Sequence, residues 1–356
     1  MPQTTPTPPS PLVATGTDED GTGGTYEYTG GNRIVSGYTS DQSVALNTTV
    51  TGISVSGNDL VISSADGNLT LSDVRDEVMT FTDANGNIIA YAYMAGEGGT
   101  VDGRGISAFE VIVGANNASD LLMASGSGSN LYGGTGTGED TLQGGAGTDI
   151  FRHTNGTTIV KNFTTGDQIN YGAADYLGFG FDYNNISLYT SEGKLDIQEV
   201  LGELVEIADI TGNFICHVFR AKESGAIDAR GVSGYQVIGG ADHQSNEIYA
   251  GNEGSSIYGG GGGYDTLIGG EGADCFMFGL GSGIDEISNA YSNDFVNLMD
   301  ASLNDITELS ITAGATKIKM SSGAELTVHG YNGVGYQIQG QMYDANIESN
   351  SFVARS

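Results

Sequence analysis

The sequence predicts an all-β protein made of two tandem solenoid modules, with short antiparallel or mixed strand layers beside the coiled parts. Three observations predict this fold: the glycine content, short alternating segments, and a long internal repeat. The chain of 356 residues contains 58 glycines, about double the share expected from average usage. Because these glycines lack the strict period of collagen, they indicate many tight turns.

Short segments of alternating apolar and polar residues begin at Thr25. They are separated by Gly, Asn and Asp, as in 52–57 (GISVSG), 68–72 (NLTLS) and 325–329 (ELTVH). Alternation of this kind, with turn residues at both ends, is the signal of a half-buried strand. Helical periodicity is weak throughout, so we expect strands and turns along the whole chain.

A long repeat relates the two halves of the chain at an offset of 126 residues. Residues 86–93 (GNIIAYAY) match 212–219 (GNFICHVF), and 102–107 (DGRGIS) match 228–233 (DARGVS). A shortened third copy follows, because 335–338 (GYQI) resemble 234–237 (GYQV). We therefore expect a Pro/Thr-rich acidic tail or docking arm at 1–24, modules at 25–151 and 152–276, and a truncated third copy with a C-terminal cap at 277–356.

The charge of the chain limits the classes of molecule that it can bind. Asp and Glu number 44 against 12 Lys and Arg, which gives a net charge of −32. A polyanion repels nucleic acid and anionic lipid head groups, so we expect neither as a partner. No apolar run of about 18 residues is present, so no membrane insertion is expected. Carboxylates gathered by folding instead predict divalent cations as ligands.

A nine-residue pattern recurs inside each module. In the second module the rows are 260–267 (GGGGYDTL) and 269–276 (GGEGADCF); in the first they are 135–142 (TGTGEDTL) and 144–151 (GGAGTDIF), after a weaker row at 125–132 (SGSGSNLY). The rows fit G-G-x-G-x-D-x-U-x in full or in part, where U is apolar. The glycines let carbonyl oxygens point inward and the aspartate adds a carboxylate, and Ca²⁺ prefers such hard oxygen ligands.

These rows resemble the haemolysin-type calcium-binding (RTX) repeat family, in its secreted structural, adhesin or surface-layer form. The resemblance implies a parallel β-roll whose successive turns fall on opposite edges, with Ca²⁺ held between turns about 18 residues apart. The Asn130 and Asp149 turns would then pair, as would the 251–256 and Asp274 turns. The residues that follow as metal-site candidates are Asn130, Asp140, Asp149, Asp265, Asp274, Gly134, Gly136, Gly145, Gly147, Gly261, Gly263, Gly270 and Gly272.

Two of these aspartates are expected to have incomplete partners. Asp140 and Asp265 would face the turns near 153–158 and 278–283, where we expect no aspartate at the matching position. Complete ligand sets are therefore expected to be few. The alternative is a solenoid that folds without metal and uses its aspartates only as turn formers.

Other reactive residues favour structural roles. His153, His217, His243 and His329 do not recur between the copies, which argues against a zinc site. Cys216 and Cys275 are expected to be small buried residues instead of nucleophiles. The repeated Asp102/Arg104 and Asp228/Arg230 pairs predict ion pairs at a turn, with a ligand-gripping role as the alternative.

The sequence as a whole predicts a secreted, extracellular or cell-surface structural protein and no enzyme. We expect a subunit of a surface layer, filament or adhesin that self-associates, with a cell-surface glycan as a second candidate partner. Residues 1–17 lack the pattern of a signal peptide, which fits the type I export that the resemblance implies. Two alternatives stay open: the calcium-binding secretion and folding portion of a larger exported enzyme, and a glycan-binding module.

Overall fold

The computed structural model of the protein describes residues 12–14, 24–172, 176–182, 184–330 and 333–355. Within these residues the chain is all-β apart from one short 3-10 helix, η1 (Leu303–Asp305), so the predicted fold class is confirmed. No helix in the described part is long and apolar enough to cross a membrane. The chain divides into two compact units, 1–161 with 192–195 (unit 1) and 162–191 with 196–356 (unit 2).

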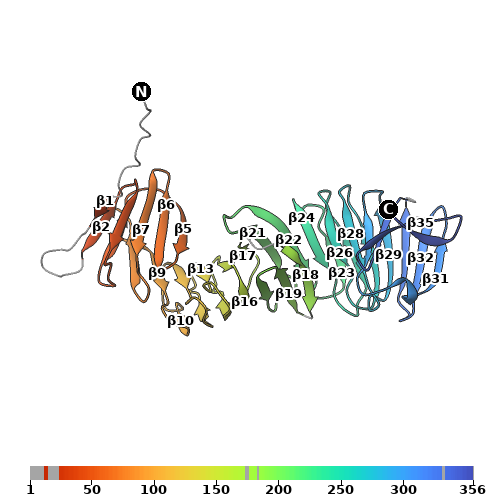
Figure 1. Ribbon diagram of the computed structural model, residues 1–356, viewed down its shortest axis with the longest axis horizontal. Coiled ribbons are helices and arrows are strands. Elements are labelled where there is room, and N and C mark those ends of the chain that lie inside the picture. Colours follow the sequence, from red (N-terminus) through yellow and green to blue (C-terminus); the bar gives the residue numbers. More distant parts are fainter. Residues whose placement is uncertain (1–11, 15–23, 173–175, 183, 331–332, 356) are drawn as a thin grey trace, which may run out of the picture. The chain divides into compact units, whose positions relative to one another are not determined.

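Unit 1 begins with short layers of mixed strands and continues as a parallel coil (Figure 1). The first sheet has the order β1 (Leu12–Ala14), β3 (Arg33–Ser36), β7 (Gly67–Ser72), β6 (Asp59–Ser64), β5 (Val50–Ser56). A second series holds β2 (Thr25–Tyr28), β4 (Ser43–Leu46), β8 (Val78–Thr82), β9 (Ile88–Met94), β11 (Phe109–Val113), β13 (Ser129–Tyr132) and β15 (Ile150–His153). The third series holds β10 (Thr100–Asp102), β12 (Leu121–Met123), β14 (Glu139–Gln143) and β16 (Gly156–Lys161). From β9 onward, the neighbours within each of the last two series pair in parallel.

Unit 2 repeats this plan. One series holds β17 (Gln168–Tyr171), β21 (Leu204–Asp209), β22 (Phe214–Arg220), β24 (Tyr235–Gly239), β26 (Ser255–Tyr258), β28 (Asp274–Phe278), β30 (Phe295–Leu298), β34 (Gly335–Ile338), β35 (Gln341–Asn346) and β36 (Ser351–Ala354). The other holds β23 (Gly225–Asp228), β25 (Asn246–Tyr249), β27 (Tyr264–Ile268), β29 (Ile284–Ala290), β33 (Glu325–Gly330), β32 (Ala315–Met320) and β31 (Ile306–Ile311). The remaining strands are β18 (Tyr176–Asp182), β19 (Asn185–Thr190) and β20 (Gly193–Ile197), the last of which has residues in both units.

Parallel strands alternate between the two sheets of the coil, so each pair of strands with its turns makes one coil of the solenoid. In unit 2 the register joins Gln236 to Ser255 and Tyr264 to Ile284. These separations of 19 and 20 residues exceed the 18 expected from two nonapeptides. The reason lies in the turns, because segments such as Gly259–Asp265 have one residue more than the six-residue turn of the motif.

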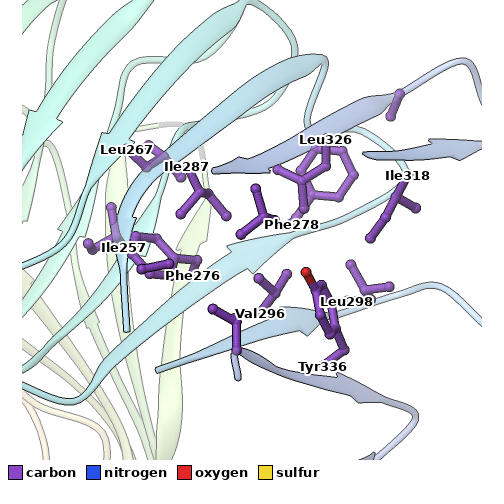
Figure 2. Packing of buried hydrophobic residues seen from close by; sticks show 14 of the residues in the cluster. Ile257, Leu267, Phe276, Phe278, Ile287, Val296, Leu298, Ile318, Leu326 and Tyr336 are labelled. Carbon is purple, nitrogen blue, oxygen red and sulfur yellow. The ribbon is translucent and has the colours of Figure 1, made fainter. Parts of the chain in front are cut away.

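An apolar stack fills the inside of each coil. The apolar residues of the nine-residue rows, Leu142, Phe151, Leu267 and Phe276, are all at most 1% exposed. Figure 2 shows Leu267 and Phe276 packed with Ile257, Ile287 and Val296 in unit 2. Burial of such side chains is the main force that holds successive coils together.

The predicted tail at 1–24 lies outside the described residues except for Leu12–Ala14 and Gly24. Leu12–Ala14 form β1, which pairs in parallel with β3 of the same chain, Leu12 opposite Arg33. The predicted module boundaries at 151 and 276 stay predictions.

Candidate metal-binding edges of the solenoid

Polar residues line up in two columns, where the turns of each edge meet their strands. In the first column the register places Glu110, Ser129 and Asp149 of unit 1 one coil apart, and likewise Gln236, Ser255, Asp274 and Asp294 of unit 2. In the second column it aligns Asp120, Asp140 and Thr158 of unit 1, and Asn246, Asp265 and Asp285 of unit 2. Every one of these residues is buried.

The glycines of the motif let neighbouring turns touch. Gly134 has φ +101°, and a Cβ there would lie 2.6 Å from the carbonyl oxygen of Ala115 one coil away. Gly260 of unit 2, at the same place in the repeat, has φ +112° and the same constraint from Ala241, at 2.7 Å. A side chain at either position meets both an unfavourable backbone region and a backbone oxygen.

The other candidate glycines fall into the same pattern with one exception. A Cβ would meet a neighbouring coil at 2.2 Å or less at Gly136, Gly145, Gly147, Gly263, Gly270 and Gly272. At Gly261 the nearest atom is Asp242 Oδ1 at 3.4 Å, which is ordinary contact. Gly261 instead donates its N–H to that oxygen at 2.7 Å.

The column carboxylates bind backbone N–H groups in two directions. One oxygen accepts from the turn that leads to the aspartate, as when Gly145 donates to Asp149 Oδ2 and Gly270 to Asp274 Oδ2, both at 2.8 Å. Other column carboxylates accept from one coil earlier, as when the N–H of Asp274 donates to Asp294 Oδ1 at 2.8 Å. The N–H of Asp120 donates to Asp140 Oδ1 in the same way, at 3.1 Å. The carboxylates therefore fasten the turns even before any ligand is considered.

Asp265 and Asp285 form the most demanding pair of the second column. They are directly in register on β27 and β29, and are 0% and 1% exposed. The N–H of Asp265 donates to Asp285 Oδ1 at 3.2 Å, while Asn246 donates both its backbone N–H and its side-chain amide to Asp265 Oδ1 at 2.8 Å. Oδ2 of each carboxylate has no hydrogen-bond partner. The two carboxyl groups are close enough to share a proton through a side-chain hydrogen bond, so the pair is compensated by that proton or by a bound cation.

Burial raises the pKa of the column aspartates. It raises the pKa of Asp140 to about 7, with the charge of Asp120 as a further cause, and that of Asp274 to about 6, with the charge of Asp294 contributing. For Asp265 and Asp285, burial again raises both pKa values, and the adjacent Asp265 carboxylate adds to the rise at Asp285. Near neutral pH these sites favour a bound proton or a bound cation.

The donor chemistry of the columns fits a hard divalent cation. Carboxylate and backbone carbonyl oxygens are the ligands that Ca²⁺ prefers. Among the described residues, however, no three acidic, histidine or cysteine side chains converge in a group that could hold a metal. An ion between Asp265 and Asp285 would therefore need carbonyl oxygens of the glycine turns for the rest of its shell.

The register corrects two expectations about the candidate residues. Asn130 pairs with Ile150, so Ser129 and not Asn130 is opposite Asp149. The weak row at 125–132 is displaced by one residue, because Leu131, at 0% exposure, takes the interior position that the motif gives to Tyr132. The turn after Asp265 was expected to lack an aspartate, which is wrong because Asp285 follows it in register. The residue opposite Asp140 is Thr158, which has no carboxylate, so the prediction that Asp140 lacks a partner aspartate is confirmed.

Four acidic column residues lie outside the motif: Glu110, Asp120, Asp285 and Asp294. A simple spacing identifies two of them, since Gly114–Asp120 and Gly279–Asp285 have the length of Gly259–Asp265. Gly240–Asn246 has that length too. The glycine at the start and the acid or amide at the end mark this turn, and the residues between them vary.

The two Asp–Arg pairs and Cys216 have the structural roles that the sequence predicts, whereas Cys275, also predicted to be buried, is only partly buried. Arg104 donates two hydrogen bonds to Asp102, at 2.8 and 2.7 Å, and Arg230 does the same to Asp228, at 2.8 and 2.6 Å. Cys216 is a free, buried thiol, and burial raises its pKa to about 12. A thiol held protonated in this way is a poor nucleophile.

Comparison with known proteins gives little beyond the geometry. No model of a protein family matches the chain, and no curated protein matches it. Among solved structures, the chain is similar in part to the crystal structure of the extracellular lipase LipA from Serratia marcescens, at 15% sequence identity and a TM-score of 0.30. The match covers 63% of this chain and 38% of the lipase chain. A likeness of this size carries no argument about activity.

Proposed function

We propose that this protein is a secreted structural protein whose solenoid edges bind Ca²⁺. The observation that carries the proposal is the stacked Asp265–Asp285 pair, with one oxygen of each buried carboxylate lacking a partner. Two buried carboxylates in register are stable at neutral pH only with a proton or a cation between them. The net charge of −32 favours the cation, because every bound Ca²⁺ also relieves repulsion elsewhere.

The residues that would hold the ions are the column aspartates together with the glycine turns beside them. Ca²⁺, when bound, supplies the positive charge that allows neighbouring carboxylates to ionise together. Asp265 and Asp285 would hold an ion at the second column of unit 2, and Asp274 and Asp294 at the first. Asp120 and Asp140 are the matching pair of unit 1. Asp149 belongs to the first column of unit 1, where Ser129 takes the place of the second acid.

An extracellular location follows from the affinity expected of such sites. Each pair offers only two carboxylates, and extracellular calcium modules with Kd of roughly 10⁻⁴–10⁻³ M are sufficient where calcium is millimolar. In the calcium-poor cytoplasm the carboxylates would stay unneutralised and oppose folding. Folding outside the cell is therefore part of the proposal.

A structural role is favoured by the way the molecule repeats. The polar groups are spread along two edges, an arrangement that suits a scaffold more than a single reaction centre. Exposed apolar pairs also recur, Ile88–Ile89 of β9 and Phe214–Ile215 of β22, at the same place in the two copies. Repeated apolar pairs on a surface favour association, which supports assembly into a filament or layer.

Calcium removal tests the proposal. We expect EGTA to lower the midpoint of thermal unfolding, followed by circular dichroism at pH 7.5, and Ca²⁺ but not the same ionic strength of NaCl to restore it. Bound calcium should be detected by mass spectrometry under non-denaturing conditions, and electron microscopy at millimolar Ca²⁺ should show polymers. An unchanged midpoint and no bound metal would refute calcium binding, while monomers alone would refute the assembly.

A further inference from the structure

Two cavities of the same construction lie at the same place in the two copies. The cavity of unit 1 has a volume of about 270 Å³ and lies between β9, β10 and β11; that of unit 2 has about 320 Å³ and lies between β22, β23 and β24. Most of the wall residues correspond at the offset of 126, including Val78 with Leu204, Val101 with Ile227, and Ile106 with Val232. The walls of both are mainly apolar, and neither cavity is part of the nine-residue rows.

The two cavities differ at one buried polar residue. Gln236 in unit 2 corresponds to Glu110 in unit 1, and they are 2% and 1% exposed. In both, one side-chain oxygen accepts a backbone N–H from the next turn: Gly251 donates to Gln236 Oε1 at 3.0 Å and Ser125 to Glu110 Oε2 at 2.9 Å. The backbone around them also matches. The backbone N–H of Gln236 donates to the carbonyl oxygen of Gly254, and that of Glu110 to the carbonyl oxygen of Gly128, both at 3.3 Å.

The two residues differ in their second polar side-chain atom. Gln236 Nε2 donates to the carbonyl oxygens of Ala229 and Val232, at 3.0 and 2.6 Å, and so is fully satisfied. The corresponding atom of unit 1 is Glu110 Oε1, which is buried and has no hydrogen-bond partner. The matching carbonyls belong to Gly103 and Ile106, which line the cavity as Glu110 does.

The backbone of unit 1 is adapted to this carboxylate. The 103–106 turn closes as its counterpart does, with Ile106 donating to Gly103 at 2.9 Å and Val232 to Ala229 at 3.1 Å. At position 103, however, the alanine of unit 2 is replaced by glycine, and a Cβ there would lie 2.4 Å from Glu110 Oε1. Acceptors thus gather where unit 2 has an N–H₂ donor, and a positively charged donor is the group they lack.

We propose that the cavity of unit 1 binds a primary ammonium group carried on an apolar chain, and that Glu110 with the carbonyl oxygens of Gly103 and Ile106 accepts its three N–H bonds. Tyr91 and Val101 line the apolar part of the cavity, where the carbon chain would lie. The ligand shares its chemistry with free alkylamines and with lysine side chains. The ammonium group would reach Oε1, which is buried, after a small rotation of the Glu110 carboxylate.

The number and type of groups favour an amine over a metal ion here. A calcium ion needs six to eight oxygen ligands, whereas a primary ammonium needs three acceptors and prefers an apolar surround for its chain. Arg104, next to Gly103 in the sequence, is paired with Asp102 at 2.7 Å. Glu110 is the first residue of the first column in unit 1, but the acid pairs proposed to bind Ca²⁺ are Asp120–Asp140, Asp265–Asp285 and Asp274–Asp294, so either proposal can fail alone.

Titration with n-butylammonium tests the site, with Ca²⁺ held constant and binding followed by calorimetry and ligand-observed NMR. We expect one site per chain and binding at least tenfold weaker for n-butanol, which has the same shape without the charge.

Matched variants assign the binding to Glu110. Glu110→Gln copies the residue of unit 2, should fold, and should bind the amine at least tenfold more weakly. The triple variant Glu110→Gln, Ala229→Gly, Gln236→Glu should regain binding, now with chemical-shift changes at Ile227 and Val237 of the cavity in unit 2. Equal binding of the amine by Glu110→Gln, equal binding of n-butanol by the native protein, or no binding at all overturns the proposal.

A final arm separates the two sources of the ammonium group. Nα-acetyl-lysine methylamide carries the group on a peptide side chain, and n-pentylammonium is a free amine of similar length and the same charge. Tighter binding of the peptide form assigns the cavity to a lysine of a partner protein, and tighter binding of n-pentylammonium assigns it to a small amine. Both results support an ammonium site, and loss of both in Glu110→Gln is required.

Discussion

The second column ends differently in the two units. In unit 2, Asp265 is followed in register by Asp285, and two carboxylate oxygens stay without partners. In unit 1, Asp140 is followed in register by Thr158. The hydroxyl oxygen of Thr158 lies 2.8 Å from Nδ1 of His153. The solenoid therefore has either a second acidic residue or a neutral residue at this position of the column.

This difference distinguishes the residues that stabilise the solenoid fold from the edge residues that respond to protons or cations. Both units stack buried apolar residues and pair their strands in parallel, whichever residue ends the column. The second acid accepts the N–H of Asp265, and its other oxygen makes this edge sensitive to protons or cations. The variants below test how much of its role is structural and how much depends on a ligand.

The largest effect is expected from the apolar stack. Phe151 of unit 1 and Phe276 of unit 2 are both fully buried, so Phe151→Ala and Phe276→Ala should each lower the free energy of unfolding by about 3–5 kcal/mol. The two losses should be alike, with and without calcium, in urea denaturation followed by circular dichroism. Leu177→Ala, at an exposed position, is the control with little effect. A loss of stability in only one of the two variants would show that the apolar stack does not stabilise both units to the same extent.

A smaller effect is expected when the acid pair of unit 2 is copied into unit 1. Thr158→Asp places a carboxylate next to Asp140 in the second column and should destabilise the calcium-free protein by about 2–3 kcal/mol at pH 8. Millimolar calcium should reverse most of the loss, whereas Thr158→Asn, the neutral control, should not respond to calcium. Hydrogen exchange read at 139–161 locates the effect. Destabilisation that calcium leaves unchanged would count against a cation between column acids.

The smallest effect is expected from the repeated surface ion pairs. Arg104 and Arg230 both bind the aspartate two residues before them, but Arg230 also lies over the ring of Tyr249, 4.4 Å from its centroid. Exposed pairs contribute little, so Arg104→Ala should shift the unfolding midpoint hardly at all, and Arg230→Ala slightly more. High salt should remove most of this difference. A large shift from Arg104→Ala would mean that the pair does more than close its turn.

Much of this arrangement follows from the sequence, and the rest depends on turn length. Glycine density, alternation and the 126-residue repeat predict the all-β coil and the buried Phe151 and Phe276. The nonapeptide pattern fixes the position of a residue only where the turn has six residues. Asn130 was therefore placed opposite Asp149 although Ser129 lies there, and Asp285 was missed. Glu110 carries no motif at all, and only its comparison with Gln236 in three dimensions shows that an oxygen lacks its donor.

The central claim is that calcium neutralises stacked carboxylates on the edges, and the pH dependence of stability tests it most directly. Burial raises the folded-state pKa of Asp140 to about 7 and of Asp274 to about 6, whereas unfolded aspartates titrate near about 3.9. The folded state therefore holds more protons, and its stability is lost as pH rises through these folded-state values.

The measurement is the free energy of unfolding from pH 5 to pH 8, with EGTA and with millimolar Ca²⁺. Without calcium we expect stability to fall across this range, and less so in the variant Asp140→Asn, Asp274→Asn. With calcium the fall should largely disappear, because the ion replaces the lost protons. Identical profiles with and without calcium would contradict the account, since the edge carboxylates would then be settled by protons and backbone N–H groups alone.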